Sequence, residues 1–229
     1  VEEQVDLMYS LIHQQVDVIV LVPIDSKALV QPAVEAVRKG IPVINIDIQL
    51  DAQLLEQAGV EVAFVGPDNF AAAYEVGKLL DKKLRNEDKV AIIEGLAAAD
   101  NAQQRKRGFI KAIEEKGLRL VASEPADWET EKAAEVFQAM WMRYPDLKAV
   151  YCSNDAMALG VLQQMQEKNC YLPVVGFDND AVMKEFLSTG KLVATADIFS
   201  SQMAVRGIEF ALDVLEGKIE NRGVHSTAY

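Results

Sequence analysis

Polar side chains close several apolar, strand-like runs of this 229-residue chain. The run IPVINID ends in Asp47, LPVVGFD ends in Asp178, and KLVATAD ends in Asp197. The run LKAVYCSND ends in Asn154 and Asp155, and DKVAIIEG opens into the polar loop AAADNAQQR. The carboxyl ends of parallel strands line one crevice of an open sheet, and ligands bind there. The pattern therefore predicts one polar site built from many short loops.

The residue types at these positions suit the hydroxyls of a sugar or polyol. A carboxylate such as Asp47 or Asp178 accepts two hydrogen bonds in a fork, which matches two vicinal hydroxyls. Arg105 follows the 95–101 loop by about one helical turn and would aim a planar guanidinium at ligand oxygens. The alternatives are solvation or helix capping for the carboxylates, and a surface position or an ion pair for Arg105.

Three further residues belong to the same set of loops. Asn154 can both donate and accept in a ligand site, whereas Asp155 is expected to be only the N-cap of the helix that follows. Trp128 follows the loop ASEPAD, and an aromatic ring there would stack on the apolar face of a sugar. The alternative for Trp128 is packing in the core.

Catalytic, cofactor and metal chemistry have little support in the sequence. Only His13 and His225 are present, and no GxSxG, Walker or GxGxxG motif occurs. The string that begins at Asp178 starts like a calcium loop but lacks the glycine and glutamate at the required offsets. We therefore expect a protein that is not an enzyme and that has no cofactor and no metal site.

Composition narrows the class of partner. The net charge is −12, from 35 acidic and 23 basic residues, and the one dense basic run, Arg105–Arg107, falls on a single helix. Nucleic-acid binding needs a positive face, so no nucleic-acid partner is expected. No apolar run reaches the roughly 18 residues that span a bilayer. The first residues, VEEQVDLMYSLIHQQ, do not resemble a signal peptide, and we expect the chain to be trimmed at both ends.

Short Val/Ile-rich runs alternate with amphipathic segments, which indicates repeated βαβ units and an α/β fold with parallel sheets. Strands are predicted near 16–23, 41–47, 60–66, 88–94, 118–123, 147–152, 172–177 and 191–197. Helices are predicted over 101–116, 129–144 and 200–216, the last with an apolar face of Ala204, Ile208, Ala211, Leu212 and Leu215. The turn Gly66-Pro67-Asp68 would separate two lobes.

The two cysteines are predicted to be buried free thiols. Cys152 falls near the carboxyl end of one predicted strand, and Cys170 precedes the amino end of the next. These ends face opposite edges of a sheet, beyond the roughly 7 Å limit for a disulfide.

The strings VPIDSKAL, IPVINIDIQ, VGPDN, RGFIKAI, ASEPADW, SNDAMALG and VVGFDND resemble the type I periplasmic binding proteins, and among them the ribose-binding type. The resemblance implies two Rossmann-like lobes joined by a hinge, residues 1–67 with 199–229 and residues 68–198. It further implies that the family's first β-α-β segment and last strand are absent from the first lobe.

The resemblance also implies a function. A monomeric protein of the periplasm, or one anchored by lipid outside the cell, would bind a sugar or polyol and deliver it to an ABC permease. The alternative is the ligand-sensing domain of a LacI-type repressor or of a membrane sensor kinase. The transport proteins and the sensing domains of LacI-type repressors belong to one superfamily. The segment IFSSQM resembles the transport proteins more than the repressors.

The resemblance carries over a set of ligand residues. Asp47, Asn101, Arg105, Trp128, Asn154 and Asp178 fall where the family has acidic, polar, arginine, aromatic, asparagine and aspartate contacts. Ile48 stands in place of a second arginine of the ribose-type pattern, and Ile198, after Asp197, stands in place of a glutamine. Since a lost fork donor removes about 1.5–3 kcal/mol of charged hydrogen bonding, ribose is not the expected best ligand.

Overall fold

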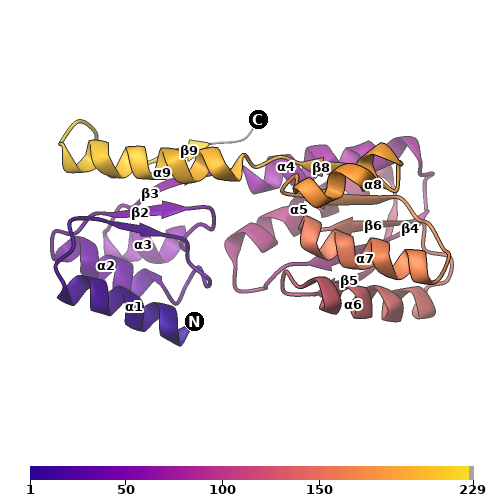
Figure 1. The fold of residues 1–229 in the computed structure, drawn as a ribbon, viewed down its shortest axis with the longest axis horizontal. Coiled ribbons are helices and arrows are strands. Elements are labelled where there is room, and N and C mark those ends of the chain that lie inside the picture. Colours follow the sequence, from indigo (N-terminus) through magenta and orange to yellow (C-terminus); the bar gives the residue numbers. More distant parts are fainter. Residues whose placement is uncertain (227–229) are drawn as a thin grey trace. The chain divides into compact units, whose positions relative to one another are not determined.

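The computed structural model describes residues 1–226, without the side chains of Asp81 and Ser226, so residues 227–229 of the predicted first lobe lie outside the described part. The chain divides into two compact units (Figure 1). Unit 1 consists of Val1–Asp68, Ala98–Asn101 and the described residues from Phe199 onward. Unit 2 consists of Asn69–Ala97 and Ala102–Ile198. Each unit is a parallel sheet covered by helices, so the predicted α/β class is confirmed.

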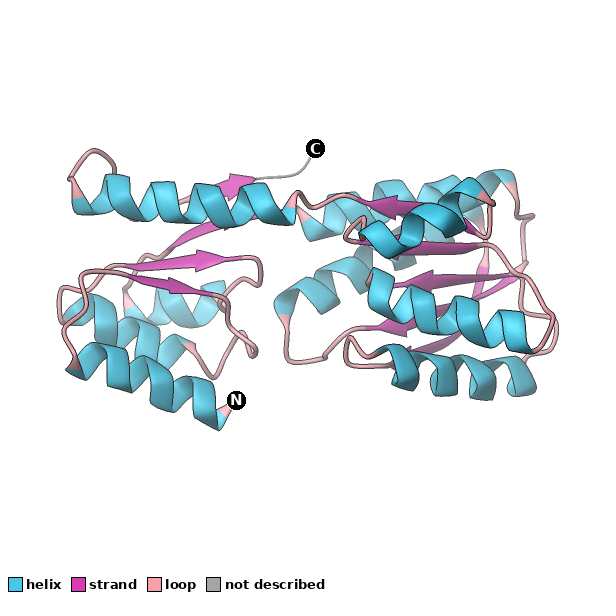
Figure 2. Ribbon diagram, in the orientation of Figure 1, coloured by secondary structure: helices cyan, strands magenta, loops and turns pink. Residues whose placement is uncertain are grey.

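Unit 1 is built on a four-stranded sheet in the order β1-β2-β3-β9, and every neighbouring pair is parallel (Figure 2). Its strands are β1 (Ile19–Leu21), β2 (Val43–Ile46), β3 (Ala63–Gly66) and β9 (Val224–Ser226). Its helices are α1 (Glu2–His13), α2 (Val30–Arg38), α3 (Ala52–Ala58) and α9 (Ser200–Leu215).

Alternate residues of β2 serve the two faces of this sheet, because successive side chains of a strand point to opposite sides. Val43 packs with residues of α1 and α2, whereas Ile44 and Ile46 pack with Ala211 of α9. Gly207 brings α9 close to the sheet, since a Cβ there would lie 2.7 Å from Cγ2 of Ile46.

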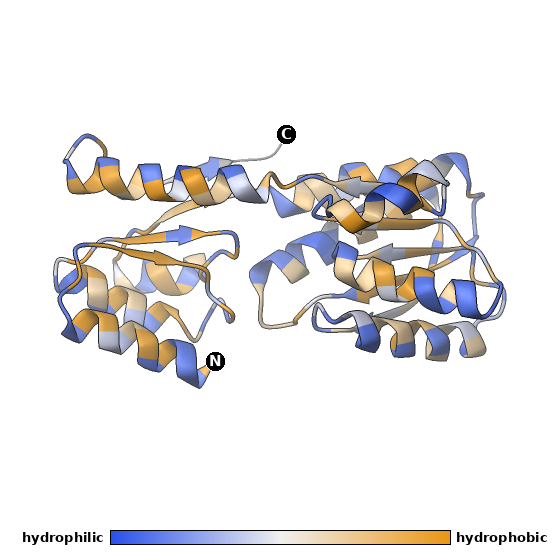
Figure 3. Cartoon of the chain, viewed as in Figure 1, coloured by the Kyte–Doolittle hydropathy of each residue, from blue (hydrophilic) through white to orange (hydrophobic). Residues whose placement is uncertain are grey.

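The predicted apolar face of α9 is wrong except at Ala211, which is buried. Met203, Gly207 and Ala211 are the residues that the helix buries. Ile208, Leu212 and Leu215 are exposed, and the helix shows apolar residues all along its length in Figure 3. The prediction followed the largest apolar side chains, but small residues on α9 are what let its backbone approach the sheet.

Unit 2 is built on a five-stranded parallel sheet in the order β5-β4-β6-β7-β8. The strands are β4 (Lys89–Glu94), β5 (Arg119–Pro125), β6 (Ala149–Cys152), β7 (Val174–Phe177) and β8 (Leu192–Ala196). The helical segments are α4 (Asn69–Lys78), η1 (Leu79–Lys82), α5 (Asp100–Lys116), α6 (Thr130–Arg143), α7 (Asp155–Glu167), η2 (Ala181–Met183) and α8 (Lys184–Ser188). The eight predicted strands are thus all present.

The two faces of this sheet carry different helices. Val150 and Cys152 of β6 pack in a core with α6 and α7. Tyr151, between them, faces the other way, and its ring lies 5.3 Å from that of Phe109 on α5. The strands of both sheets are largely apolar in Figure 3, as expected when helices cover both sides.

Both cysteines are free, as predicted. Cys152 is fully buried at the end of β6, and burial raises the pKa of its thiol far above the ordinary value. Cys170, between α7 and β7, is only half-buried, so the prediction of burial holds for Cys152 alone. Among the described helices, none combines the length and the hydropathy that a membrane crossing requires.

Close packing of α6 on α7 generates a stability prediction. A Cβ at Gly160 would stand 2.0 Å from the carbonyl oxygen of Thr130. Alanine within a helix usually stabilises by about 0.5–1 kcal/mol relative to glycine. Here we expect Gly160→Ala to lower the free energy of unfolding by about 1–3 kcal/mol, because the two helices must separate. Urea denaturation followed by circular dichroism measures the change.

Gln163→Ala on the exposed face of α7 is the matched control, and it should stay within about 0.5 kcal/mol of wild type. A Gly160→Ala protein that is more stable than wild type would contradict the close contact between the helices.

Candidate ligand-binding site

The carboxyl edge of the unit 2 sheet gathers most of the predicted ligand residues. Because the five strands are parallel, their carboxyl ends lie along one edge. Trp128 follows β5, Asn154 follows β6, Asp178 follows β7 and Asp197 follows β8. The observed register therefore brings together side chains that are up to 69 residues apart in the sequence (197 − 128).

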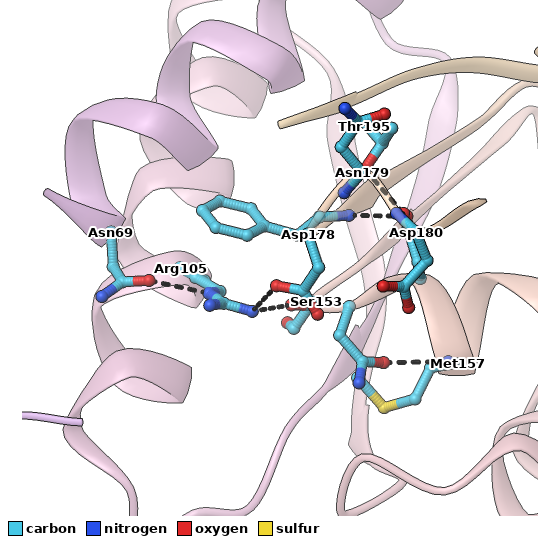
Figure 4. A network of polar contacts seen from close by, with 11 residues as sticks. Asn69, Arg105, Ser153, Met157, Asp178, Asn179, Asp180 and Thr195 are labelled. Atoms are coloured by element: carbon cyan, nitrogen blue, oxygen red, sulfur yellow. Dashed lines mark hydrogen bonds and ion pairs between the residues drawn. The ribbon is translucent and has the colours of Figure 1, made fainter. Parts of the chain in front are cut away.

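Arg105 is the buried centre of this edge (Figure 4). Its side chain is 3% exposed, although the residue is among the most polar in the chain. Nε donates to Oδ1 of Asn69 at 2.8 Å, and Nη1 donates to the carbonyl oxygen of Ser153 at 2.8 Å. Nη1 also donates to Oδ1 of Asp178 at 3.2 Å, which makes a charged pair with a carboxylate that is 24% exposed. The guanidinium thus joins α4, the end of β6 and the end of β7.

Two aromatic rings lie against the same guanidinium. Its carbon is 3.8 Å from the centroid of Phe177 and 5.6 Å from that of Trp128. The negative face of an aromatic ring attracts a cation, and this attraction strengthens where water is removed. Trp128 itself lies over Gly95, where a Cβ would meet the ring at 2.0 Å, and it also packs on the core. Core packing thus describes part of the position of Trp128, and its stacking on a sugar stays a prediction.

The backbone at this edge takes uncommon conformations. Trp128, Asp178 and Asn179 have φ values of 73°, 111° and 58°. Non-glycine residues adopt such values only where the surroundings hold them. The Asp178 amide donates to the carbonyl oxygen of Ala196 at 2.7 Å, and the Asn179 side chain donates to Oδ2 of Asp197 at 2.9 Å. The loop after β7 is thus tied to β8 and to the residue that follows it.

Asn154 caps the helix that Asp155 was predicted to cap, while its ligand role stays a prediction. Asn154 is the N-cap of α7, and its Oδ1 accepts from the Met157 amide at 2.8 Å. Asp155 is fully buried, and its Oδ1 accepts from the Phe177 amide at 3.0 Å. Its Oδ2 accepts from the Asp180 amide at 2.8 Å and from the Thr195 hydroxyl at 3.0 Å. The prediction that Asp155 is only a cap was wrong because the long-range partners on β7 and β8 leave no trace near it in the sequence.

Burial raises the pKa of Asp155 from 3.8 to about 6, while its hydrogen bonds from Asp180, Thr195 and Phe177 lower it in part. The folded state therefore binds the proton more tightly than the unfolded chain does. This group contributes stability that is complete below about pH 4 and is lost as the pH rises through about 6.

In unit 1, Asp47 and Ile48 follow β2 and are half-buried. Asp47 has a φ of 65°, and its amide donates to the carbonyl oxygen of Val65 at 3.1 Å. The loop is organised by Asn45, which is 1% exposed and which the sequence analysis did not single out. Its amide donates to the Leu21 and Ile48 carbonyls at 3.2 and 2.8 Å, and its Oδ1 accepts from the Leu50 amide. An asparagine inside an otherwise apolar strand was the available signal.

Three other predicted positions differ in exposure. Asn101 is 5% exposed and belongs to unit 1, and Ile198 is 6% exposed at the end of unit 2. Asp197 is exposed. The structure thus assembles Arg105, Asp178 and Trp128 directly, and places Asn154 and Asp197 beside them in sequence order along the edge.

The basic run on α5 does not form a positive face. Arg105 points inward, and Lys106 pairs with Glu94 at 2.7 Å. Glu94 ends β4, is 8% exposed and also accepts from the Ser123 hydroxyl at 2.5 Å. Within residues 1–226, the described side chains include no group of three or more His, Cys, Asp or Glu placed to hold a metal ion.

Comparison with known proteins gives the family. The model of the periplasmic binding protein domain matches residues 1–219, and the chain belongs to this family. Its sequence is 42% identical over 217 residues to the D-ribose/D-allose-binding protein of Pseudomonas aeruginosa, covering 94% of this chain and 68% of that protein. It is 34% identical to the D-allose-binding periplasmic protein of Escherichia coli, covering 93% of this chain and 70% of that protein.

A solved structure supports the same family membership. The ABC transporter solute-binding protein of Actinobacillus succinogenes with bound D-allose superposes with a TM-score of 0.91 at 33% identity. The match covers 98% of this chain and 81% of that one. The predicted family resemblance is confirmed, and membership in a family of binding proteins supports the expectation that the chain is not an enzyme.

The buried fork of Arg105 generates a second prediction. Arg105→Lys keeps the charge but cannot reach Asn69, Ser153 and Asp178 together, because an ammonium has no planar fork. We expect the free energy of unfolding to fall by about 2 kcal/mol or more, since at least one buried acceptor loses its donor. Urea denaturation measures it, with Arg107→Lys on the exposed face of the same helix as control. Equal stability of the two variants would contradict the central position of Arg105.

The different hydrogen bonds of Asn154 and Asp155 generate a third prediction. Asn154→Ala should destabilise by about 1 kcal/mol, as the loss of an N-cap does. Asp155→Ala should destabilise by more, about 2–4 kcal/mol, because three donors then lack their acceptor. Thermal unfolding at pH 7.5 compares the two variants. The opposite order would contradict the weight given to the long-range hydrogen bonds of Asp155.

Proposed function

We propose that this chain binds a monosaccharide of the allose or ribose class in the periplasm and delivers it to an ABC permease. The observation that carries the proposal is the pair of the buried Arg105 with the half-buried Asp178, with Trp128 beside it. A guanidinium and a carboxylate side by side offer donors and acceptors to neighbouring hydroxyls, and an indole offers a surface to the apolar face of the ring. The Pseudomonas and Escherichia coli relatives named for D-allose support the same class of ligand.

Within this proposal, D-allose binds more tightly than D-ribose. The ground is the pair of positions at which the chain departs from the ribose-type pattern. Ile48 and Ile198 carry no donor, and Ile198 is buried. A ligand whose hydroxyls need donors there would leave them unpaired, at about 1–3 kcal/mol for each. The roles expected for Asp47, Asn101 and Asn154 belong to the same proposal.

The proposal also includes the partners. The protein works as a monomer, with no nucleic-acid partner and with no cofactor, and its periplasmic location follows from its family. A lipid anchor outside the cell is the alternative form of the same location. Ligand sensing for a membrane kinase or a repressor would use the same binding chemistry, so a sugar-binding test bears on both roles, and uptake of labelled sugar with the cognate permease separates them.

A ligand screen by thermal unfolding tests the proposal. At a hundred times its dissociation constant, a ligand stabilises the folded state by about 2.7 kcal/mol. For a chain of this length, we expect the melting temperature to rise by roughly 5–10 °C with D-allose. D-ribose should give a smaller rise at equal concentration, and D-mannitol serves as the open-chain control. If no sugar in the screen raises the melting temperature, the proposed ligand class is wrong.

A further inference from the structure

Asp155 lies directly behind the candidate site without being part of it. Its two oxygens accept three hydrogen bonds, two from the loop at Phe177 and Asp180 and one from Thr195 on β8. Residues Phe177 and Asp180 bracket Asp178, whose carboxylate meets Arg105. The carboxylate of Asp155 therefore holds both ends of the segment that presents Asp178.

Two other observations indicate that the surroundings of Asp155 suit a side chain that only accepts hydrogen bonds. Gly176 leaves room for it, since a Cβ there would stand 2.1 Å from Oδ1 of Asp155. The Thr195 hydroxyl makes two hydrogen bonds at once. It donates to Asp155, and its oxygen accepts from the Asn179 amide at 3.1 Å. An ionised carboxylate is an acceptor only, whereas a protonated acid or an amide carries a donor of its own.

From this geometry we propose that Asp155 is a positioning residue for the ligand site, and that binding weakens when its carboxylate takes up a proton. The ionised group holds the uncommon backbone of Asp178 and Asn179 in place. A proton on Oδ2 forces the Thr195 hydroxyl to turn, which disturbs its contact with Asn179 and loosens the loop. The effect on ligand binding rests on the proposed function. The effect of Asp155 on the loop after β7 does not depend on the ligand.

The charges around Asp155 are consistent with a proton taken up near neutral pH. The carboxylate of Asp180 raises the pKa of Asp155, in addition to burial. The thiol of Cys152 on β6 also interacts with Asp155 and stays protonated, because its own pKa is raised. In the same loop, Asp178 is paired with Arg105 of α5, and beyond β8 Asp197 is bound to Asn179.

The first experiment needs no ligand. The backbone amide signals of Phe177, Asp178 and Asp180 are followed by nitrogen–proton correlation spectra of the full chain from pH 4.5 to 8. We expect a common titration with a midpoint near pH 6 in the wild type, which is absent in Asp155→Asn. The control Asp146→Asn, which removes an exposed carboxylate paired with Lys89 ahead of β6, should keep the step. Asp178 and Asp180 signals that do not titrate together overturn the positioning role.

The second experiment measures affinity by calorimetry with D-allose as the probe. Wild-type affinity should fall about tenfold between pH 7.5 and pH 5, because the ionised fraction falls about tenfold for each unit below the pKa. Asp155→Asn should bind about tenfold more weakly at pH 7.5, since its amide faces a donor, and should show no such step. Asp180→Asn keeps the backbone amide that donates to Asp155 but removes the neighbouring charge, so it should move the midpoint to lower pH.

The outcomes separate this inference from the proposed function. Wild-type affinity that is constant between pH 5 and 7.5 overturns the link between the proton and the ligand. Failure of the wild type to bind any sugar refutes the proposed function, while the amide titration still decides the role of Asp155. Asp155→Asn protein that binds with wild-type affinity and keeps the pH step overturns the whole inference.

Discussion

The candidate site depends on one constraint: a guanidinium can be buried only where acceptors surround it. Arginine stays charged inside a protein, and an unpaired buried charge is far more costly than an unpaired amide. The chain meets this constraint with an asparagine from α4, a main-chain carbonyl after β6 and a carboxylate after β7. Each of these acceptors comes from a different element, so the position of Arg105 depends on how α4, β6 and β7 are placed in unit 2.

The same constraint explains why the loop after β7 is held so firmly. The carboxylate that accepts from Arg105 belongs to a residue with an uncommon backbone conformation, since Asp178 has a φ of 111°. The hydrogen bonds from Asp178 to Ala196, and from Phe177 and Asp180 to Asp155, supply that restraint. A rigid loop whose acceptor and donor are already placed favours ligand binding, because less order must be imposed when the ligand arrives.

Much of this architecture could be predicted from the sequence. The strands were visible as apolar runs because helices cover both faces of each sheet, and the polar residues at their ends were visible because apolar runs stop there. The direction of Arg105 was also predictable, since it lies early in a helix that begins at the carboxyl edge. What these features share is that each is encoded by residues close together in the sequence.

The wrong predictions, by contrast, concern features that depend on residues far apart in the sequence or on close packing between elements. Whether Asn154 or Asp155 caps α7 depends on donors from residues 177–195, which no local pattern near residue 155 announces. The buried face of α9 is set by the small residues Gly207 and Ala211, which allow close approach, and not by the larger Ile208 and Leu212. Asn45 was overlooked because its role is to join a loop to the neighbouring strand.

The most direct test is a double-mutant cycle between Arg105 and Asp178 in the absence of ligand. The single variants Arg105→Met and Asp178→Asn and the double variant are compared by urea denaturation, because each single variant removes the charged pair. The account predicts a coupling free energy of about 1 kcal/mol or more, because the two residues form one half-buried charged pair. Losses that add within about 0.5 kcal/mol would show that the two side chains act independently, and would contradict the view that this pair organises the site.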